Sequence, residues 1–244
     1  MIVNHEERQD LIREQAAAAA HAEGLLLVED EGLVVENAGL TEWPVPLLGR
    51  FDEAYLDVPP EVIQLTARTN QKYFVCEDGA GKLANAFVCT ANIVALDGGA
   101  EIVAGNRKVL AARLSDARFF WDNDRKIPLQ SRFDKLANIV FHERLGTVKQ
   151  KAERVMLLSR QMAELVGANP ADAQFAAQLA KCDLVSEMVG EFPELEGTMG
   201  RYYATKDMFS APVADAIRDH YKPKGPSDEV PTEPTAVAVA LADK

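Results

Sequence analysis

The chain of 244 residues is long enough for one large domain or two ordinary ones. With 48% apolar and 26% charged residues its composition is that of a globular protein, and no run of 18 apolar residues predicts a membrane span. The net charge of −12 argues against a protein that coats nucleic acid non-specifically, because neutralising phosphates takes clustered lysines and arginines.

The first 60 residues predict alternating helices and strands. Residues 6–22 are rich in good helix formers, and Asn4 is placed as their N-cap. The apolar run at 25–28 fits a buried strand, and two prolines favour an extended chain over 43–51. Pro59-Pro60 predicts the start of another helix, because proline is well tolerated in a first helical turn.

A hairpin and a long helix complete this part of the chain. Two β-prone runs, 72–76 and 86–92, flank a glycine-containing turn at 78–81. Residues 100–120 then predict a helix. The N-terminal part, to about residue 135, is therefore expected to be a mixed α/β domain.

The remainder of the chain is expected to be an all-α domain. Apolar residues at helical spacing predict helices over residues 147–166, 172–184 and 211–221, a proline-rich loop over 222–234, and an apolar helix from 236. This last helix stops after Lys244 with no glycine or asparagine to cap it, and the first helix begins almost at residue 1. We therefore expect both ends to be cuts in a longer protein.

The cysteines and the N-terminus indicate a cytoplasmic protein. Cys76, Cys89 and Cys182 form no Cys-x-x-Cys pair and are odd in number, which is typical of reduced thiols rather than of a disulfide framework. The first residues have no basic stretch followed by an apolar one, so no signal peptide is predicted.

The stretch from Arg107 to Lys135 is basic. It carries eight positive and four negative side chains, a local charge of +4 inside an acidic chain. Such an asymmetry points to a polyanionic partner. A solvated helix face is the alternative interpretation, and the sequence leaves both open.

A second group of residues suggests metal chemistry. His142, the pair Cys182-Asp183 and the distant Asp243 resemble the His…His-Asp…Asp order of HD phosphohydrolases, whose side chains hold a divalent metal that activates water. Here a cysteine stands where the second histidine is needed, and a thiolate suits zinc or copper rather than magnesium or manganese. We therefore expect no metal site and keep a metal-dependent HD phosphohydrolase as the alternative.

Several longer motifs resemble the β subunit of bacterial heterotetrameric glycyl-tRNA synthetase. They lie at residues 42–52, 70–74, 91–93, 105–120, 145–154, 181–204 and 240–244, and they include Glu42-Trp-Pro, Leu145-Gly-Thr and Glu191-Phe-Pro-Glu-Leu-Glu-Gly. The resemblance covers nearly the whole chain. It implies an α+β fold: an editing-like domain over 1–135, similar to that of phenylalanyl-tRNA synthetase β chains and truncated at its N-terminus, and a degenerate HD-like helical domain over 136–244, truncated at its C-terminus.

The resemblance also implies a function. The family joins glycine to tRNA(Gly) with ATP, and the active site lies on a separate α subunit of an α2β2 assembly. This fragment is then expected to carry no catalytic residue, no metal and no cofactor, and to serve tRNA recognition and assembly without membrane or DNA partners. The tRNA contacts expected in it are Arg107, Arg113, Arg125 and Lys126, while His142, Cys182, Asp183 and Asp243 are vestigial HD positions. A scaffold that only docks the α subunit is a third possibility.

Overall fold

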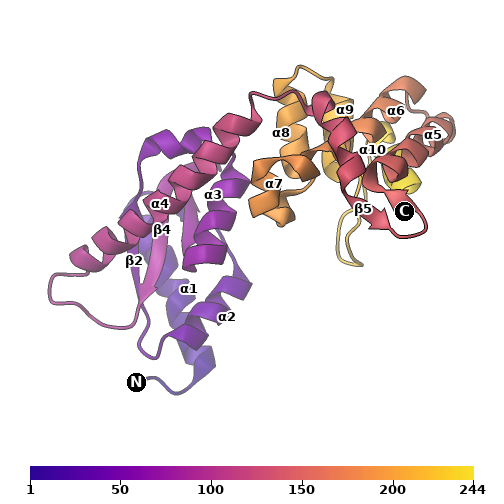
Figure 1. Cartoon of the computed structure of the whole chain (residues 1–244). Coiled ribbons are helices and arrows are strands. Elements are labelled where there is room, and N and C mark those ends of the chain that lie inside the picture. Colours follow the sequence, from indigo (N-terminus) through magenta and orange to yellow (C-terminus); the bar gives the residue numbers. More distant parts are fainter. The chain divides into compact units, whose positions relative to one another are not determined.

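The computed structural model describes all 244 residues and divides the chain into two compact units, Met1–Phe119 and Phe120–Lys244 (Figure 1). The sequence places the boundary later, after residue 135. Residues 120–135 belong to the second unit because Trp121, Asp124 and Arg132 are buried there, against Tyr203 and the start of the helix at Glu187.

The first unit is a four-stranded antiparallel sheet with helices. Its strands are β1 (Leu26–Leu27), β2 (Val45–Arg50), β3 (Phe74–Glu77) and β4 (Leu83–Ala91), in the order β1-β3-β4-β2. Its helices are α1 (His5–Ala22), α2 (Glu31–Leu40), α3 (Pro60–Thr66) and α4 (Ala100–Asp124), which runs on into the second unit.

Helices cover both faces of this sheet. Leu48, Phe74 and Val88 point to one face and pack with the buried residues of α1 and α2. The opposite face meets α4: Asn106 donates to the sulfur of Cys89 at 3.3 Å, and a Cβ on Gly49 would lie 2.8 Å from Val103. The unit therefore has three layers, with β1 and β2 as the edge strands.

The second unit is mostly helical. Its elements are η3 (Leu129–Asn138), β5 (Val140–His142), β6 (Gly146–Thr147), α5 (Val148–Val166), α6 (Pro170–Leu179), η4 (Cys182–Val185), α7 (Glu187–Glu191), η5 (Pro193–Leu195), α8 (Thr198–Lys206), α9 (Ala211–Asp219) and α10 (Pro234–Asp243). Helix α5 packs against α6 and α10, and α9 packs against α8, α10 and α6. No helix in either unit is long and apolar enough to cross a bilayer.

Most of the predicted elements are confirmed. Asn4 caps α1 by accepting from the backbone N–H of Glu6, the hairpin forms between β3 and β4, and Thr147 and Gln150 make a reciprocal capping box at the start of α5. The mixed N-terminal fold and the mainly helical C-terminal fold follow from these elements.

Three expectations are wrong in detail. The second unit is not all-α, because β5 and β6 pair as a short antiparallel hairpin that places His142 on a strand. The helix predicted to run to residue 184 ends at Leu179, since Cys182–Val185 form a separate 3-10 turn. In the run at 25–28, Leu25 is buried but Leu26 is 53% exposed, because β1 is an edge strand only two residues long.

Candidate functional site

Two of the four residues expected to bind RNA lie on the exposed surface of α4. Arg107 and Arg113 are exposed, and neither has an ion pair or a side-chain hydrogen bond. The neighbouring Lys108 is exposed and unpaired as well. Six residues at about 100° each put Arg107 and Arg113 roughly 120° apart around the helix axis. They lie on either side of the buried positions Leu110 and Leu114. Lys108 lies about 100° from Arg107 on the side away from these buried positions, so the three cations are spread around the exposed part of α4.

The other two expected residues follow α4 in the second unit and are partly neutralised. The guanidinium of Arg125 pairs with Asp122 at 2.6 Å and lies 4.9 Å above the Trp121 ring. The Lys126 ammonium donates to Asn123 at 2.9 Å. Both side chains are exposed, so they can still contact a ligand, but each would exchange an existing partner for it.

The basic stretch as a whole is not one surface. Arg132 is 2% exposed and donates to the carboxylate of Asp124 at 2.9 Å. Trp121 is buried as well, stacked on Tyr203 with ring centroids 5.8 Å apart. These two residues belong to the core of the second unit and cannot stack on bases. The candidate RNA contacts in this stretch are therefore limited to the exposed cations outside that core.

Asp124 organises this core and was not expected from the sequence. Its Oδ1 accepts from Arg132 and from the backbone N–H of Glu187, and its Oδ2 accepts from the backbone N–H of Met188 and from the hydroxyl of Tyr203, all at 2.9–3.1 Å. A carboxylate buried with four donors is well satisfied. The only sequence signal was an acidic residue at the end of a helical pattern, where a negative charge is unfavourable unless it has partners.

The structure does not bring the four vestigial HD positions into one metal site. No group of three or more His, Cys, Asp or Glu side chains has the spacing to hold a metal ion. His142 is exposed on β5, where its Nδ1 accepts from the backbone N–H of Arg144 at 3.1 Å. Cys182 is fully buried, its sulfur donates to the carbonyl of Gln178, and burial raises the pKa of the thiol to about 12.

Asp183 is an acceptor for backbone amides. Its side chain is fully buried, and Oδ2 accepts from the N–H groups of Gly197 and Gly200 at 2.7 and 2.9 Å. A Cβ on Gly200 would lie 3.0 Å from this oxygen, so the glycine is what allows the approach. Burial raises the pKa of Asp183 to about 7, although both amides lower it. This contact explains why the motif pairs Cys182-Asp183 with Gly197-x-x-Gly200.

Asp243 lies in a different cluster, which contains two lysines. Its oxygens are 2.8 Å from the ammonium of Lys151 and 3.1 Å from that of Lys181. The Lys181 ammonium also lies 2.9 Å from Nε2 of His220 and 3.5 Å from the centre of the Tyr221 ring. Each oxygen of Asp243 thus already has a cation, and a divalent metal would have to displace an ammonium to reach it.

The environment of this cluster shifts the pKa values of its bases. Burial lowers the pKa of Lys181 to about 8 and that of His220 to about 3, and the nearby ammonium lowers the histidine further. His220 Nδ1 lies 2.6 Å from the carbonyl of Ile217, so it donates there while Nε2 accepts from Lys181. The sequence did not single out His220 or Lys151, because their partner, Asp243, is distant in sequence.

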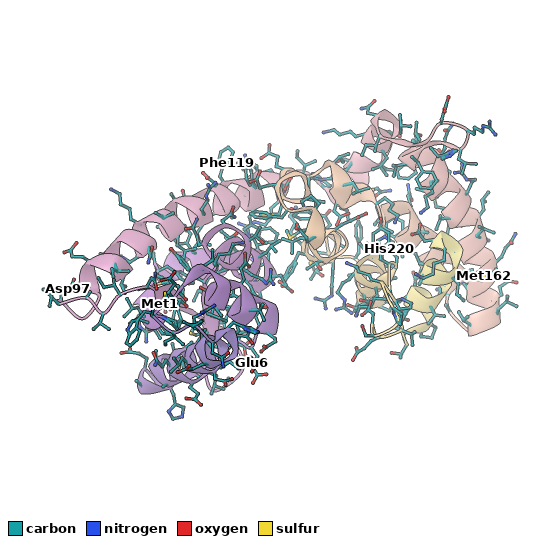
Figure 2. The ribbon with its side chains drawn as sticks, turned by 90° about the horizontal axis from the view of Figure 1, so that it is seen from below. Met1, Glu6, Asp97, Phe119, Met162 and His220 are labelled. Atoms are coloured by element: carbon teal, nitrogen blue, oxygen red, sulfur yellow. The ribbon has the colours of Figure 1, made fainter.

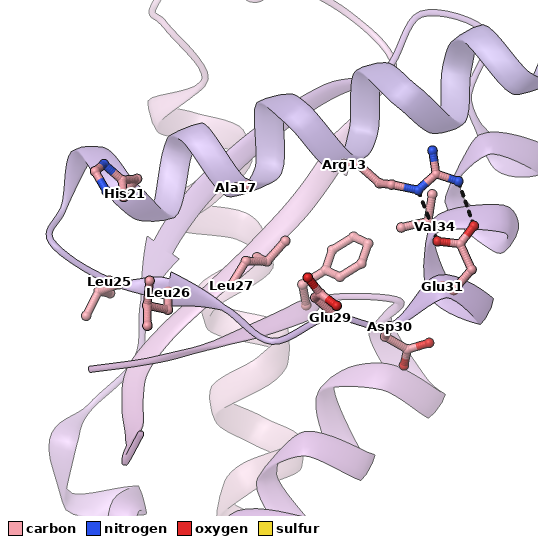
Figure 3. Close-up of a pocket in the computed structure, with 11 residues that line it drawn as sticks. Arg13, Ala17, His21, Leu25, Leu26, Leu27, Glu29, Asp30, Glu31 and Val34 are labelled. Atoms are coloured by element: carbon pink, nitrogen blue, oxygen red, sulfur yellow. Dashed lines mark hydrogen bonds and ion pairs between the residues drawn. The ribbon is translucent and has the colours of Figure 1, made fainter. Parts of the chain in front are cut away.

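A pocket of about 400 Å³ opens in the first unit between α1 and the segment from β1 to α2 (Figure 3). Its interior is apolar, with Leu27, Val34 and Phe74. At its rim the guanidinium of Arg13 makes two hydrogen bonds to the carboxylate of Glu31, at 2.6 and 3.0 Å. The guanidinium of Arg13 therefore already has two carboxylate partners, Glu31 and, at 2.6 Å, Asp10.

Comparisons with known proteins cover the whole chain. Residues 1–244 match the family model described as Glycyl-tRNA synthetase beta subunit. The chain is 53% identical to the Glycine–tRNA ligase beta subunit of Rhodospirillum centenum (strain ATCC 51521 / SW) and 52% identical to that of Phenylobacterium zucineum (strain HLK1), in each case over 100% of this chain. It spans only 35% and 37% of the length of those two relatives.

Proposed function

Because the chain belongs to the glycyl-tRNA synthetase beta subunit family, we propose that it recognises tRNA and supports assembly within a glycine–tRNA ligase. In this proposal the chain forms glycyl-tRNA together with an alpha subunit that carries the active site and uses ATP. The two units supply binding surface and no reacting group. The relatives' names, which specify a ligase and a beta subunit, support the ligase and the partner chain.

One observation favours RNA recognition over a purely structural part. Arg107, Lys108 and Arg113 are exposed around α4 without partners, in a chain whose net charge is −12. Unpaired arginines on a surface are suited to bidentate contacts with phosphates. Electrostatic attraction to RNA therefore needs only these local cations and does not depend on the charge of the whole chain.

The domain assignments belong to the same proposal. We infer an editing-like domain in the first unit, predicted as residues 1–135, and a degenerate HD-like domain in the second, predicted as residues 136–244; residues 120–135 pack with the second unit. The antiparallel sheet with helices on both faces is compatible with the first, and the packed helices α5, α6, α9 and α10 with the second. The ammonium groups of Lys151 and Lys181 on Asp243 support an HD-like shell that holds no metal.

Charge reversal in the complete ligase tests the RNA contacts. We expect R107E/R113E and R125E/K126E each to raise the Michaelis constant for tRNA(Gly) about tenfold or more, because each removes two cations from phosphates, and to leave kcat and the constant for ATP unchanged. The matched control is K82E/K224E, which reverses two exposed lysines away from α4.

Two other outcomes would favour the alternatives. If all these variants keep the constant for tRNA but removal of this region abolishes the assembly, the chain is a scaffold for the alpha subunit. If the purified chain holds stoichiometric manganese, iron or zinc and turns over phosphate esters, it is an HD phosphohydrolase.

A further inference from the structure

An open groove of about 610 Å³ runs along the outer edge of the sheet in the first unit. Strand β2 supplies Leu47, Leu48 and Arg50 to it, and α4 supplies Val103, Ala104 and Arg107. We call it the edge groove. It lies at the start of α4, next to Asp97, which Figure 2 labels at that end of the helix.

The groove offers backbone hydrogen-bond donors. Strand β2 pairs only with β4, so its other side is free. The N–H of Phe51 donates to the carbonyl of Asn85, and in an antiparallel ladder such residues alternate with residues that point the other way. The backbone N–H groups of Leu48 and Arg50 therefore face the groove.

The charge available in the groove is positive. Arg107 has no partner, and Arg50 has a single one, Glu23, at 3.1 Å, in a pair whose side chains are both about half exposed. Asp97 also lines the groove, but its oxygens accept from the backbone N–H groups of Gly99 and Glu101 at 2.9 Å. These bonds lower its pKa, so Asp97 stays ionised and brings one negative charge to a groove that is also lined by the two guanidinium groups of Arg50 and Arg107.

We propose that the edge groove binds an unpaired nucleotide of RNA, with Arg107 on its phosphate and its base or ribose against the apolar floor formed by Leu47, Val103 and Ala104. The inference rests on the proposed function and assigns it a site. The volume of the edge groove lies in the range of about 300–1,000 Å³ that is typical of pockets for single small ligands. Proteins recognise RNA sequence mostly at unpaired nucleotides, whose bases can leave the stack and enter such a pocket.

The first test measures charge. Binding of a short labelled single-stranded RNA to the chain is followed by fluorescence anisotropy at several salt concentrations. We expect R107Q to weaken binding about tenfold and to reduce the slope of log K against log salt by about 0.7, the value for one phosphate contact on a single strand. K82Q is the matched control, because Lys82 is exposed in the turn between β3 and β4 and does not line the groove.

The second test fills the groove without changing charge. Ala104 is exposed and lines it, so A104F places a ring in the space for the nucleotide, whereas A112F adds the same ring at an exposed position of α4 outside it. We expect A104F alone to weaken binding of the single strand about tenfold. Binding of a blunt-ended RNA duplex, which has no unpaired nucleotide, should be equal in both variants.

The outcomes distinguish a failure of the groove assignment from a failure of the proposed function. If A104F binds the single strand as A112F does, while R107E/R113E still raises the Michaelis constant for tRNA(Gly), the groove is not the site but the proposed function stands. If the parent chain binds ATP more tightly than the single-stranded RNA and A104F loses this ATP binding, the occupant is a free nucleotide and the RNA assignment is overturned. Equal thermal melting of A104F and A112F excludes misfolding as the cause.

Discussion

Asp183 shows how a buried carboxylate can organise a turn without taking part in chemistry. One oxygen accepts from two amides and the other has no partner, although the side chain is fully buried. The pKa of about 7 is higher than the unfolded value of 3.8, so the folded chain binds more protons between these pH values. The stability that Asp183 contributes, measured as unfolding free energy, therefore falls as the pH rises from about 4 to 7.

Substitution of Asp183 by asparagine should remove this pH dependence. D183N keeps an oxygen for the amides of Gly197 and Gly200 and cannot ionise. We expect its unfolding free energy relative to the parent to rise by about 1.4 kcal/mol per pH unit from pH 4 to 7 and to level off above. Urea unfolding at a series of pH values measures this. As a control, D116N at an exposed position should give a curve of unfolding free energy against pH that is parallel to that of the parent. A D183N curve parallel to that of the parent would contradict the raised pKa of Asp183.

Lys181 belongs to a pair that is expensive to break. Its side chain and that of Asp243 are each 5% exposed. K181M leaves the aspartate with Lys151 alone and removes the partner of His220, so we expect a loss of about 3 kcal/mol in unfolding free energy. K149M breaks a pair with Asp134, whose side chain is 87% exposed, and should cost far less, because exposed ion pairs contribute little to stability. Chemical denaturation of both variants makes the comparison, and equal losses would count against a buried cluster.

Sequence patterns identified residues with local partners and missed those with distant ones. The cap Asn4 was predicted, because a cap and the amide from which it accepts lie within three residues of each other. Three of the four donors to Asp124 lie 63 or more residues later in the chain, at Glu187, Met188 and Tyr203. The lysines on Asp243 come from α5 and from the turn before η4. No periodicity joins such positions. The phosphate contacts of Arg107 and Arg113 remain predictions.

At the scale of elements, glycine acts in opposite ways in two helices. In α8 a Cβ on Gly200 would lie 2.6 Å from the side chain of Ile217 and 3.0 Å from Asp183. In α4 nothing lies within 4 Å of a Cβ on the exposed Gly105. The first glycine permits close packing, and the second only weakens its helix.

Replacement of these two glycines by alanine should therefore change the unfolding free energy in opposite directions. G200A is expected to lower the unfolding free energy by about 1–3 kcal/mol through overpacking, and G105A to raise it by about 0.5–1 kcal/mol through helix propensity. Thermal melts of the two variants decide the matter. A stabilised G200A would show that α8 can shift away from α9 at little cost.

Elements with a clear period were predictable and short or uniformly apolar ones were not. The β3–β4 hairpin and α5 follow from alternation and from helical spacing. Helix α2 has apolar residues on most sides, so its ten residues show no stripe to predict it. Helices α7 and α8 are held by the bonds of Asp124 and Asp183 rather than by a pattern of their own.

For the whole molecule, the sequence predicted two units but not where one ends. The basic stretch was treated as the end of the first unit, whereas Trp121, Asp124 and Arg132 pack into the second. Burial, which a single sequence does not reveal, decides which residues of a helix belong to which core. Helix α4 contributes to both units, because it runs from Ala100 to Asp124 across the boundary at Phe119.

That continuity makes the length of α4 a constraint on how this chain can vary. Removing one residue from an exposed position such as Ala112 would turn every later residue of the helix by about 100° relative to the earlier ones. Leu114 and Ala117, which are buried in the first unit, would then turn away from their packing partners, so we expect the deletion to lose hydrogen-exchange protection in residues 1–119, whereas A112G should not. Insertions and deletions among natural variants should accordingly avoid this helix and gather in the loop after α9.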